Sequence, residues 1–196
     1  MTYICFSKRQ RLIMPKIIAK KEDWIILGYK LFSKTGINGI VVEKMALKLK
    51  VNKSSFYWHF KTKKDFLDEI ISFWISTDTN KIIVKVKTKS IGKEQFNCLI
   101  ELVFKKEPYL DFIFFLKRYA LKDKKIQELI DEVDNQRIEF AKSILMEMGF
   151  SEHEAKIKAV LLYKYLIGYH EMIRYKKQSP NYLKEVKKEL NQFIKF

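Results

Sequence analysis

Apolar residues recur along most of the chain at the three- and four-residue spacing of one face of an α-helix. Val42, Met45, Ala46 and Leu49 show this spacing over one short segment, and the later segments repeat it over longer stretches. The pattern predicts helices at about 20–35, 42–49, 53–59, 62–75, 93–106, 108–121, 123–148, 152–176 and 180–195. We therefore expect an all-α fold of about nine helices.

Polar residues mark several of the predicted helix ends. Asn52 is a favourable N-cap for the third helix. Thr62 with Asp65, and Ser151 with Glu154, have the three-residue spacing of a capping box. Ser179-Pro180 predicts a further N-cap, followed by proline in the first helical turn.

The segment 81–90, KIIVKVKTKS, is ambiguous because it alternates lysine with β-branched residues. Taken alone, it is typical of a β-strand. A single short strand would have no partner in an otherwise helical chain, so we favour a frayed helix end followed by a linker.

The net charge of +16 is concentrated near the start of the chain. Residues 1–63 hold 14 Lys or Arg and 3 Asp or Glu, a net charge of +11, whereas residues 64–196 hold 25 and 20, a net charge of +5. Such a basic segment favours a polyanionic partner. A generally lysine-rich proteome is the alternative, but it explains the concentration less easily.

Cysteine usage and hydropathy indicate a cytoplasmic protein. Cys5 and Cys98 are the only cysteines, and neither has a nearby partner, so both are expected to be reduced. No apolar run approaches the ~20 residues of a membrane span. Residues 1–14 are interpreted as a flexible basic N-terminal extension, although Met14 could also begin a shorter chain.

The stretch 51–66, VNKSSFYWHFKTKKDF, combines aromatic residues with lysine, serine and histidine. Two helices joined by only Lys50-Val51-Asn52 predict a helix-turn-helix. In the second helix, Phe56 and Phe60 share the inward face, which leaves the polar side chains free to approach base edges and phosphates.

Residues 41–70, VVEKMALKLKVNKSSFYWHFKTKKDFLDEI, resemble the DNA-binding signature of the TetR family of bacterial transcriptional regulators. YWHFKTK at 57–63 carries most of the likeness, which covers about residues 20–75. The resemblance implies a DNA-binding domain at 15–79, with its helix-turn-helix at about 41–60. It also implies an effector-binding and dimerisation domain at 80–196.

The resemblance also assigns roles within the DNA-binding region. The residues expected to contact DNA are Lys50, Lys53, Ser54, Ser55, Tyr57, Trp58, His59 and Lys63. Among them, residues 53–55 would face the major groove, while Tyr57, His59 and Lys63 would contact phosphates. Alternatively, Tyr57 is part of the core and His59 only forms a hydrogen bond between helices.

Two positions depart from the family pattern. Val41 replaces the usual Thr or Ser cap of the second helix, and a lost cap costs ~0.5–2 kcal/mol. Lys50 replaces the usual glycine of the turn, where a left-handed backbone would cost roughly 1–2 kcal/mol. We hypothesise that charge near DNA recovers part of this cost at Lys50.

The remainder of the chain contains no catalytic constellation, so no enzyme activity and no cofactor are expected. His153 and His170 have no ligand-type neighbours at metal-binding spacing. By resemblance, the last two helices would pair with those of a second copy to form a homodimer. The apolar stretch 159–169, AVLLYKYLIGY, must be covered on more than one side; a central helix of the monomer is the alternative explanation.

A ligand cavity is expected between the helices at 108–121, 123–148 and 152–176. The candidate wall residues are Phe112, Phe115, Tyr119, Phe140, Tyr163 and His170. For each of them plain core is the favoured alternative. Their aromatic character favours an apolar or aromatic small-molecule effector.

The sequence therefore predicts a ligand-responsive homodimeric repressor. A two-fold dimer would bind a near-palindromic operator in double-stranded DNA, with half-sites ~34–36 Å apart, and the effector would release it. Two alternatives are a helical sensing or interaction protein that has lost specific DNA binding and, less favoured, a basic protein of membrane surfaces.

Overall fold

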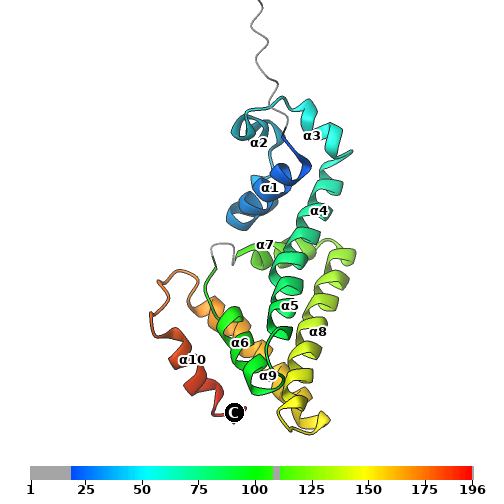
Figure 1. Cartoon of the computed structure of the whole chain (residues 1–196). Helices are drawn as coiled ribbons and strands as arrows, with labels where there is room; N and C mark the ends of the chain where they lie inside the picture. Colours follow the sequence, from blue (N-terminus) through cyan, green and yellow to red (C-terminus); the bar gives the residue numbers. More distant parts are fainter. Residues whose placement is uncertain (1–18, 108–110, 196) are drawn as a thin grey trace, which may run out of the picture.

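The computed structural model describes residues 19–107 and 111–195 of the 196-residue chain, and these residues form helices joined by turns and loops (Figure 1). In order, the elements are α1 (Lys21–Thr35), η1 (Gly36–Gly39), α2 (Val42–Leu49), α3 (Ser54–His59), α4 (Lys63–Ile75), η2 (Ser76–Asn80), α5 (Lys81–Lys87), α6 (Lys93–Val103), α7 (Asp111–Ala120), α8 (Lys124–Glu147), α9 (Glu152–Met172) and α10 (Tyr182–Leu190). The expected all-α fold is confirmed. The predicted N-terminal extension and the helix start at Pro108 lie outside the described residues.

Residues 63–87 form one continuous helix that contains a π-helical turn. The element η2 is that turn, and the residues on both sides of it keep right-handed helical backbone angles. Counted as a single helix, α4, η2 and α5 bring the described helices to the expected nine. The strand interpretation of 81–90 is therefore wrong, and the helix ends at Lys87, before the bend that leads to α6.

The capping signals fix most helix starts as expected. Thr62 Oγ1 accepts a hydrogen bond from the Asp65 N–H at 3.1 Å, and the Asp65 carboxylate accepts one from the Thr62 N–H at 3.0 Å. The Ser151 and Glu154 pair forms the same reciprocal box. The expected cap at Ser179 is wrong, because its hydroxyl accepts from the Asn181 N–H within a turn and α10 starts only at Tyr182.

Helix α9 ends at Met172, earlier than the apolar pattern predicts, and a lysine from another loop binds the backbone carbonyl groups that follow it. The Lys106 ammonium donates to the carbonyl oxygens of Ile173, Arg174 and Lys176 at 2.8–3.0 Å. These carbonyls follow the last turn of α9, where a cation also interacts favourably with the helix dipole. Lys106 therefore holds the loop after α6 against the loop that leads to α10.

The helices α1, α2 and α3, which we call the head, lie at one end of the molecule, and α9 and α10 lie toward the other (Figure 1). The helix containing α4 and α5 runs from the head into the body, which comprises α5 to α10. Gly28 lets α1 approach α4 closely: a Cβ at this position would lie 2.5 Å from the Phe66 ring and 2.6 Å from Ile70.

The interior contains two hydrophobic clusters, and each combines helices that are not consecutive in the sequence. The first contains the buried residues of α1 to α4, together with Phe112 and Leu116 of α7 and Ile126 and Ile130 of α8. The second joins α5, α6, α9, α10 and the later part of α8. Helix α7 therefore contributes to the core of the head, although it follows α6 in sequence.

Within residues 19–107 and 111–195, no helix is both long and apolar enough to cross a membrane.

Candidate DNA-binding surface and ligand cavity

The turn between α2 and α3 sets the geometry of the predicted helix-turn-helix. Lys50 has a left-handed backbone, with φ 56° and ψ 40°, as expected for a residue that replaces glycine. This conformation brings the Val51 N–H to within 3.0 Å of the Ala46 carbonyl oxygen and closes the end of α2. The N-cap residue of α3 is Lys53 rather than the expected Asn52, but the Asn52 side chain accepts a hydrogen bond from the Ser54 N–H at 3.1 Å just before the helix.

The inner face of α3 is an aromatic contact with the head. Phe56 is fully buried, and its ring centroid lies 5.3 Å from that of Trp24 and 5.1 Å from that of Phe66. Phe60 is also buried and packs on Phe56. These contacts fix the rotation of the short helix and so determine which side chains point outward.

The outer face of α3 is exposed and carries most of the predicted DNA contacts. Lys53 and Ser54 are exposed, and Ser55 is half-buried. Tyr57 is 53% exposed and Trp58 is 80% exposed. Tyr57 also packs edge-on against Phe56, so it combines a core contact with an accessible hydroxyl end.

The lysines predicted to contact DNA lie at and beside this face. Lys50 and Lys63 are exposed, at the end of α2 and the start of α4 respectively. The Lys53 ammonium lies 3.9 Å from a Glu43 carboxylate oxygen, and both side chains are largely solvent-accessible. Such an exposed pair is weak, so it leaves Lys53 available to an anion.

His59 is positioned by the main chain of the head. The ring is half-buried, and its Nε2 lies 2.9 Å from the Ala19 carbonyl oxygen, to which it must donate. A neutral ring then presents Nδ1 as an acceptor, so only the protonated ring could also donate to a phosphate. The alternative considered for His59 was a hydrogen bond between helices; the observed bond instead joins α3 to the segment before α1.

Val41 lacks the cap that a hydroxyl would provide. It occupies the N-cap position of α2 with an extended backbone and forms no side-chain hydrogen bond there. The packing of Val42 and Met45 into the head core holds the helix start instead.

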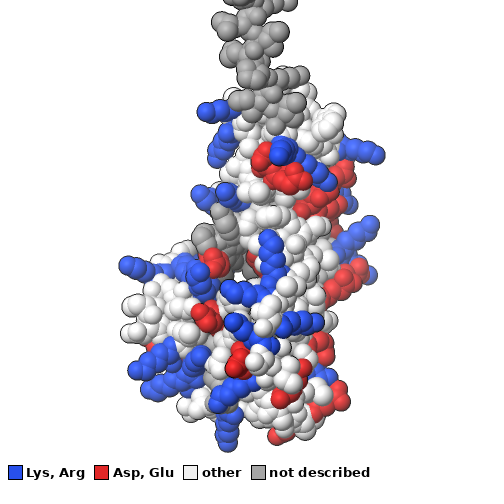
Figure 2. Space-filling view, in the orientation of Figure 1, with Lys and Arg blue, Asp and Glu red and all other residues white. Residues whose placement is uncertain are grey.

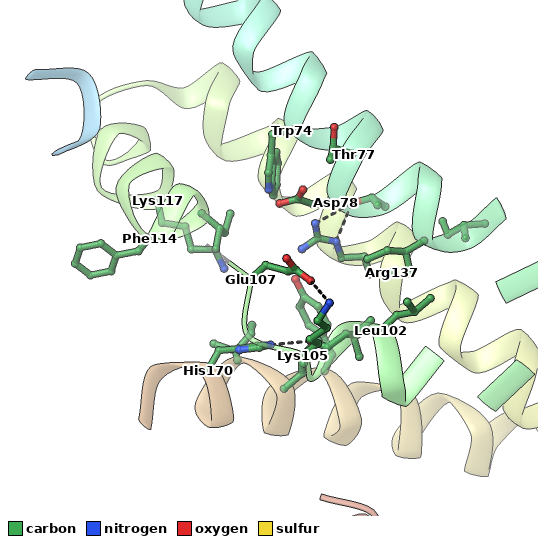
Figure 3. A pocket seen from close by; sticks show the side chains of 18 of the residues that line it. Trp74, Thr77, Asp78, Leu102, Lys105, Glu107, Phe114, Lys117, Arg137 and His170 are labelled. Carbon is green, nitrogen blue, oxygen red and sulfur yellow. Dashed lines mark hydrogen bonds and ion pairs between the residues drawn. The ribbon is translucent and has the colours of Figure 1, made fainter. Parts of the chain in front are cut away.

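A cavity of about 950 Å³ lies in the body, between α4–α5, α6, α7, α8 and α9, with α1 contributing part of the wall. Its volume is at the upper end of the range typical of small-molecule sites. Figure 3 shows side chains converging on it from α4–η2, α7 and α8 on one side and from α6 and α9 on the other. The deeper walls are aliphatic and aromatic, and they include Ile82, Leu99, Leu102, Phe140, Leu162 and Leu166.

Asp78 is an acidic residue of the cavity wall whose pKa is raised. It lies on the π-helical turn, and the Tyr29 hydroxyl of α1 donates to its carboxylate at 3.2 Å. Burial raises the pKa of Asp78 to about 6, and the Tyr29 hydrogen bond and the Arg137 charge oppose that rise only in part.

Arg137 extends from α8 across the cavity to the same turn (Figure 3). Its Nε and one terminal nitrogen donate to the Thr79 Oγ1 at 3.0 and 2.7 Å. The guanidinium also lies over the Trp74 ring, 5.1 Å from its centroid. Arg137 therefore links α8 to the π turn without forming an ion pair with a carboxylate of the described residues.

His170 and Tyr163 present polar groups from α9. The Nε2 of His170 lies 2.7 Å from the Val103 carbonyl oxygen, whereas its Nδ1 is buried without a partner among the described residues. Burial lowers the pKa of His170, which favours the neutral ring. The Tyr163 hydroxyl donates to Asp134 at 2.5 Å, and burial is the main cause that raises the pKa of Tyr163 to about 12.

The predicted cavity wall is correct in part. Phe140, Tyr163 and His170 line the cavity. Phe112 does not, because it is fully buried in the head core between Phe32 and Trp74. Phe115 and Tyr119 line a separate pocket beside Gly36. Helix α7 presents Ile113, Phe114, Lys117 and Arg118 to the main cavity instead.

Several cavity residues that the sequence did not indicate lie on the π turn or contact it. Trp74, Thr77, Asp78 and Thr79 all line the cavity, as does Arg137. The polar run STDTN at 76–80, within an otherwise apolar helix, was the available signal. No group of His, Cys, Asp and Glu suited to a metal ion occurs in the part of the chain that the structure describes.

The head also matches known proteins in sequence. Residues 27–70 match the family model for bacterial regulatory proteins of the tetR family. Over these residues, the chain is similar to the TetR family. The tetracycline repressor protein class D of Escherichia coli is 36% identical over 50 residues, which are 26% of this chain and 23% of the repressor. The class H repressor of Photobacterium damsela subsp. piscicida gives the same figures, so the chain matches less than a quarter of the length of either relative.

The fold extends the likeness beyond the head. A structure from Saccharomonospora viridis in complex with choline superimposes with a TM-score of 0.75 at 16% identity, covering 89% of this chain and 95% of that one. A transcriptional regulator from Rhodococcus sp. Rha1 gives a TM-score of 0.73 at 13% identity, with coverage of 90% and 97%. At these identities, the likeness establishes the fold alone. The family model that matches residues 27–70 describes bacterial regulatory proteins.

Proposed function

We propose that this protein is a ligand-responsive transcriptional regulator of the cytoplasm that binds a near-palindromic operator as a homodimer. The observation that carries the proposal is the outer face of α3. It holds Lys53, Ser54, Tyr57 and Trp58 toward solvent while Phe56 locks the helix against the head. An exposed, basic and aromatic helix after a tight turn is suited to the major groove. A small-molecule effector, apolar or aromatic in its main part, would bind in the cavity and release the DNA.

The proposed mechanism uses the continuous helix from α4 to α5. Its first residue, Lys63, lies beside α3, and its π turn lines the cavity. A ligand that prefers one arrangement of this helix would change the spacing of the two heads in a dimer. The ligand can shift DNA affinity only by its difference in affinity for the two arrangements.

A gel-shift assay with the DNA upstream of the gene tests the proposal. We expect specific binding at physiological salt, and we expect Lys53→Ala to weaken it about tenfold, which corresponds to the loss of one base or phosphate contact. Lys188→Ala is the matched control, because Lys188 is exposed on α10, far from the head.

A helical sensing protein that has lost specific DNA binding is the second candidate, and it is supported by the missing cap at Val41 and by the strained turn at Lys50. It requires weak, sequence-independent binding, with a Kd of ~10⁻⁴–10⁻⁶ M. Affinity in that range for the upstream DNA, unchanged by Lys53→Ala, would contradict the regulator.

A further inference from the structure

The charges around the cavity are not balanced. Among the described residues, six Lys or Arg and three Asp or Glu line it. Two of the acidic residues lie beside lining cations, because Glu107 is 3.3 Å from Lys105 in an exposed pair and Glu171 pairs with Arg174. Lys117 pairs with Asp134, which lies outside the lining. Of the lining cations, Lys30, Arg118 and Arg137 form no ion pair with a carboxylate of residues 19–107 or 111–195.

The third acidic residue is also engaged. Asp78 accepts from Tyr29 and interacts electrostatically with Arg137, so the opposite charges of Asp78 and Arg137 partly offset one another near the π turn. Lys30 and Arg118 therefore remain as the uncompensated charges. Lys30 projects from α1 of the head and Arg118 from α7, and both side chains are exposed at the cavity wall. Lys and Arg side chains border the hollow in the middle of the face shown in Figure 2.

The deeper walls have the opposite character. Leu99 and Leu102 of α6, Phe140 of α8, and Leu162 and Leu166 of α9 form a continuous apolar lining away from the head. The cations without a carboxylate partner on the α1 and α7 side, Lys30 and Arg118, thus lie across the cavity lining from an aliphatic and aromatic group that comes from α6, α8 and α9.

We propose that the cavity binds an amphiphilic organic anion, a carboxylate whose acid group meets Lys30 and Arg118 and whose apolar body lies among the side chains of α6, α8 and α9. This inference rests on the proposed function, because it names the chemical class of the effector. It adds that the acid group contacts a residue of the head itself, so that the ligand bridges the head and the body directly.

Calorimetric titration of the full chain with three ligands that share one ten-carbon tail tests the anion. The ligands are decanoate, decan-1-ol and decyltrimethylammonium, each below its micelle concentration. We expect decanoate to bind about tenfold more tightly than the alcohol, since two partly screened cations each contribute a few-fold. The ammonium ligand carries the same class of charge as the choline in the Saccharomonospora viridis structure. Equal or tighter binding of the alcohol or the ammonium ligand, or no binding of decanoate, overturns the inference.

Substitutions locate the acid group. Lys30→Gln and Arg118→Gln should each weaken decanoate binding by about three- to fivefold and leave decan-1-ol binding unchanged. Lys188→Gln, on the exposed side of α10 and outside the cavity lining, is the control and should change neither. Unchanged decanoate affinity in both cavity variants overturns the proposed position. If a variant loses decan-1-ol binding as well, the salt dependence of ligand binding to the wild-type protein tests the charge interaction instead. The inference then requires that added salt weakens decanoate binding and leaves decan-1-ol binding unchanged.

Chain length tests the apolar side. Between hexanoate and decanoate, affinity should rise by about fourfold for each buried methylene. An affinity independent of length would place the acids on the outer surface and overturn the inference. Operator binding in the gel shift is a separate measurement: its loss contradicts the regulator, whereas failure of decanoate to bind contradicts only the ligand class.

Discussion

Asp78 is held in an environment that opposes its charge. Burial raises its pKa from 3.8 to about 6, and the two favourable partners, Tyr29 and Arg137, do not offset the lost hydration. Between these pKa values the folded protein binds more protons than the unfolded chain does, so this group makes stability fall as pH rises from about 4 to about 6. Above that range, the charge costs the folded state up to about 3 kcal/mol.

We predict that Asp78→Asn stabilises the protein at pH 8 by about 1–3 kcal/mol, because an amide keeps an acceptor for Tyr29 without the buried charge. The gain should disappear near pH 4, where the wild-type carboxyl is mostly protonated in the folded protein. Urea unfolding at both pH values measures the difference.

Asp131→Asn provides the control, because Asp131 is an exposed carboxylate on α8, outside the cavity lining. If Asp78→Asn raised the free energy of unfolding by the same amount at pH 4 and at pH 8, burial of the Asp78 charge would not be the cause. A residue that lowers the stability of its own fold is typical of a functional site, because function there often has a cost in stability.

Single residues also show which features of the structure the sequence could predict and which it could not. The exposure of Tyr57 and Trp58 followed from the burial of Phe56 and Phe60 on the opposite face of one short helix, which spacing alone can reveal. The contact between Arg137 and Thr79 joins residues 58 positions apart, and no local pattern encodes it. The same limit explains Phe112: helical spacing gives it a buried face but does not say which core that face enters.

At the scale of elements, the short turn between α2 and α3 is strained where the family pattern has glycine. Lys50 holds a left-handed backbone that costs a residue with a side chain roughly 1–2 kcal/mol. The turn nevertheless closes α2 and starts α3 in the orientation that exposes Lys53. A charge close to bound DNA would account for a lysine at this position.

We predict that Lys50→Gly stabilises the folded protein by about 1 kcal/mol in urea unfolding, because glycine adopts this conformation without strain. It should also weaken operator binding several-fold and reduce its salt dependence, as expected when one phosphate contact is lost. Lys50→Ala removes the charge but keeps the strain, so it should weaken binding without the gain in stability. Equal operator affinity in all three proteins would show that the Lys50 charge has no role in binding.

The helices themselves were largely predictable, because an amphipathic stripe and a capping box are both local features of the sequence. Both predicted boxes formed, and most of the predicted boundaries fell within a few residues of the observed ones. The π turn at 76–80 was not predictable in this way, since its conformation depends on α8 through Arg137. The end of α9 likewise depends on Lys106, a residue of another loop.

At the scale of the whole molecule, α9 has more apolar surface than one copy of the chain covers. Ala155, Ala159 and Leu162 are buried against the body, whereas Ile157 and Leu161, one turn apart on the outer side, remain 48% and 44% exposed. Met172 continues this exposed surface at the end of the helix. A second copy of α9 would cover such a face across a two-fold axis, which is the arrangement that a palindromic operator requires.

We predict that Leu161→Glu converts a dimer into a monomer in sedimentation experiments, since a two-fold axis would bring the two new carboxylates together in a desolvated contact. Operator affinity should then fall toward the non-specific level of ~10⁻⁴–10⁻⁶ M, because a single head reads only one half-site. Leu161 does not line the cavity, so decanoate binding should persist and show that the body remains folded. Ile91→Glu is the control, because Ile91 is 74% exposed in the loop before α6 and lies outside α9. A Leu161→Glu protein that sediments as the wild type would place the dimer contact elsewhere, and a wild-type protein that is itself monomeric would remove the two-fold symmetry on which operator recognition depends.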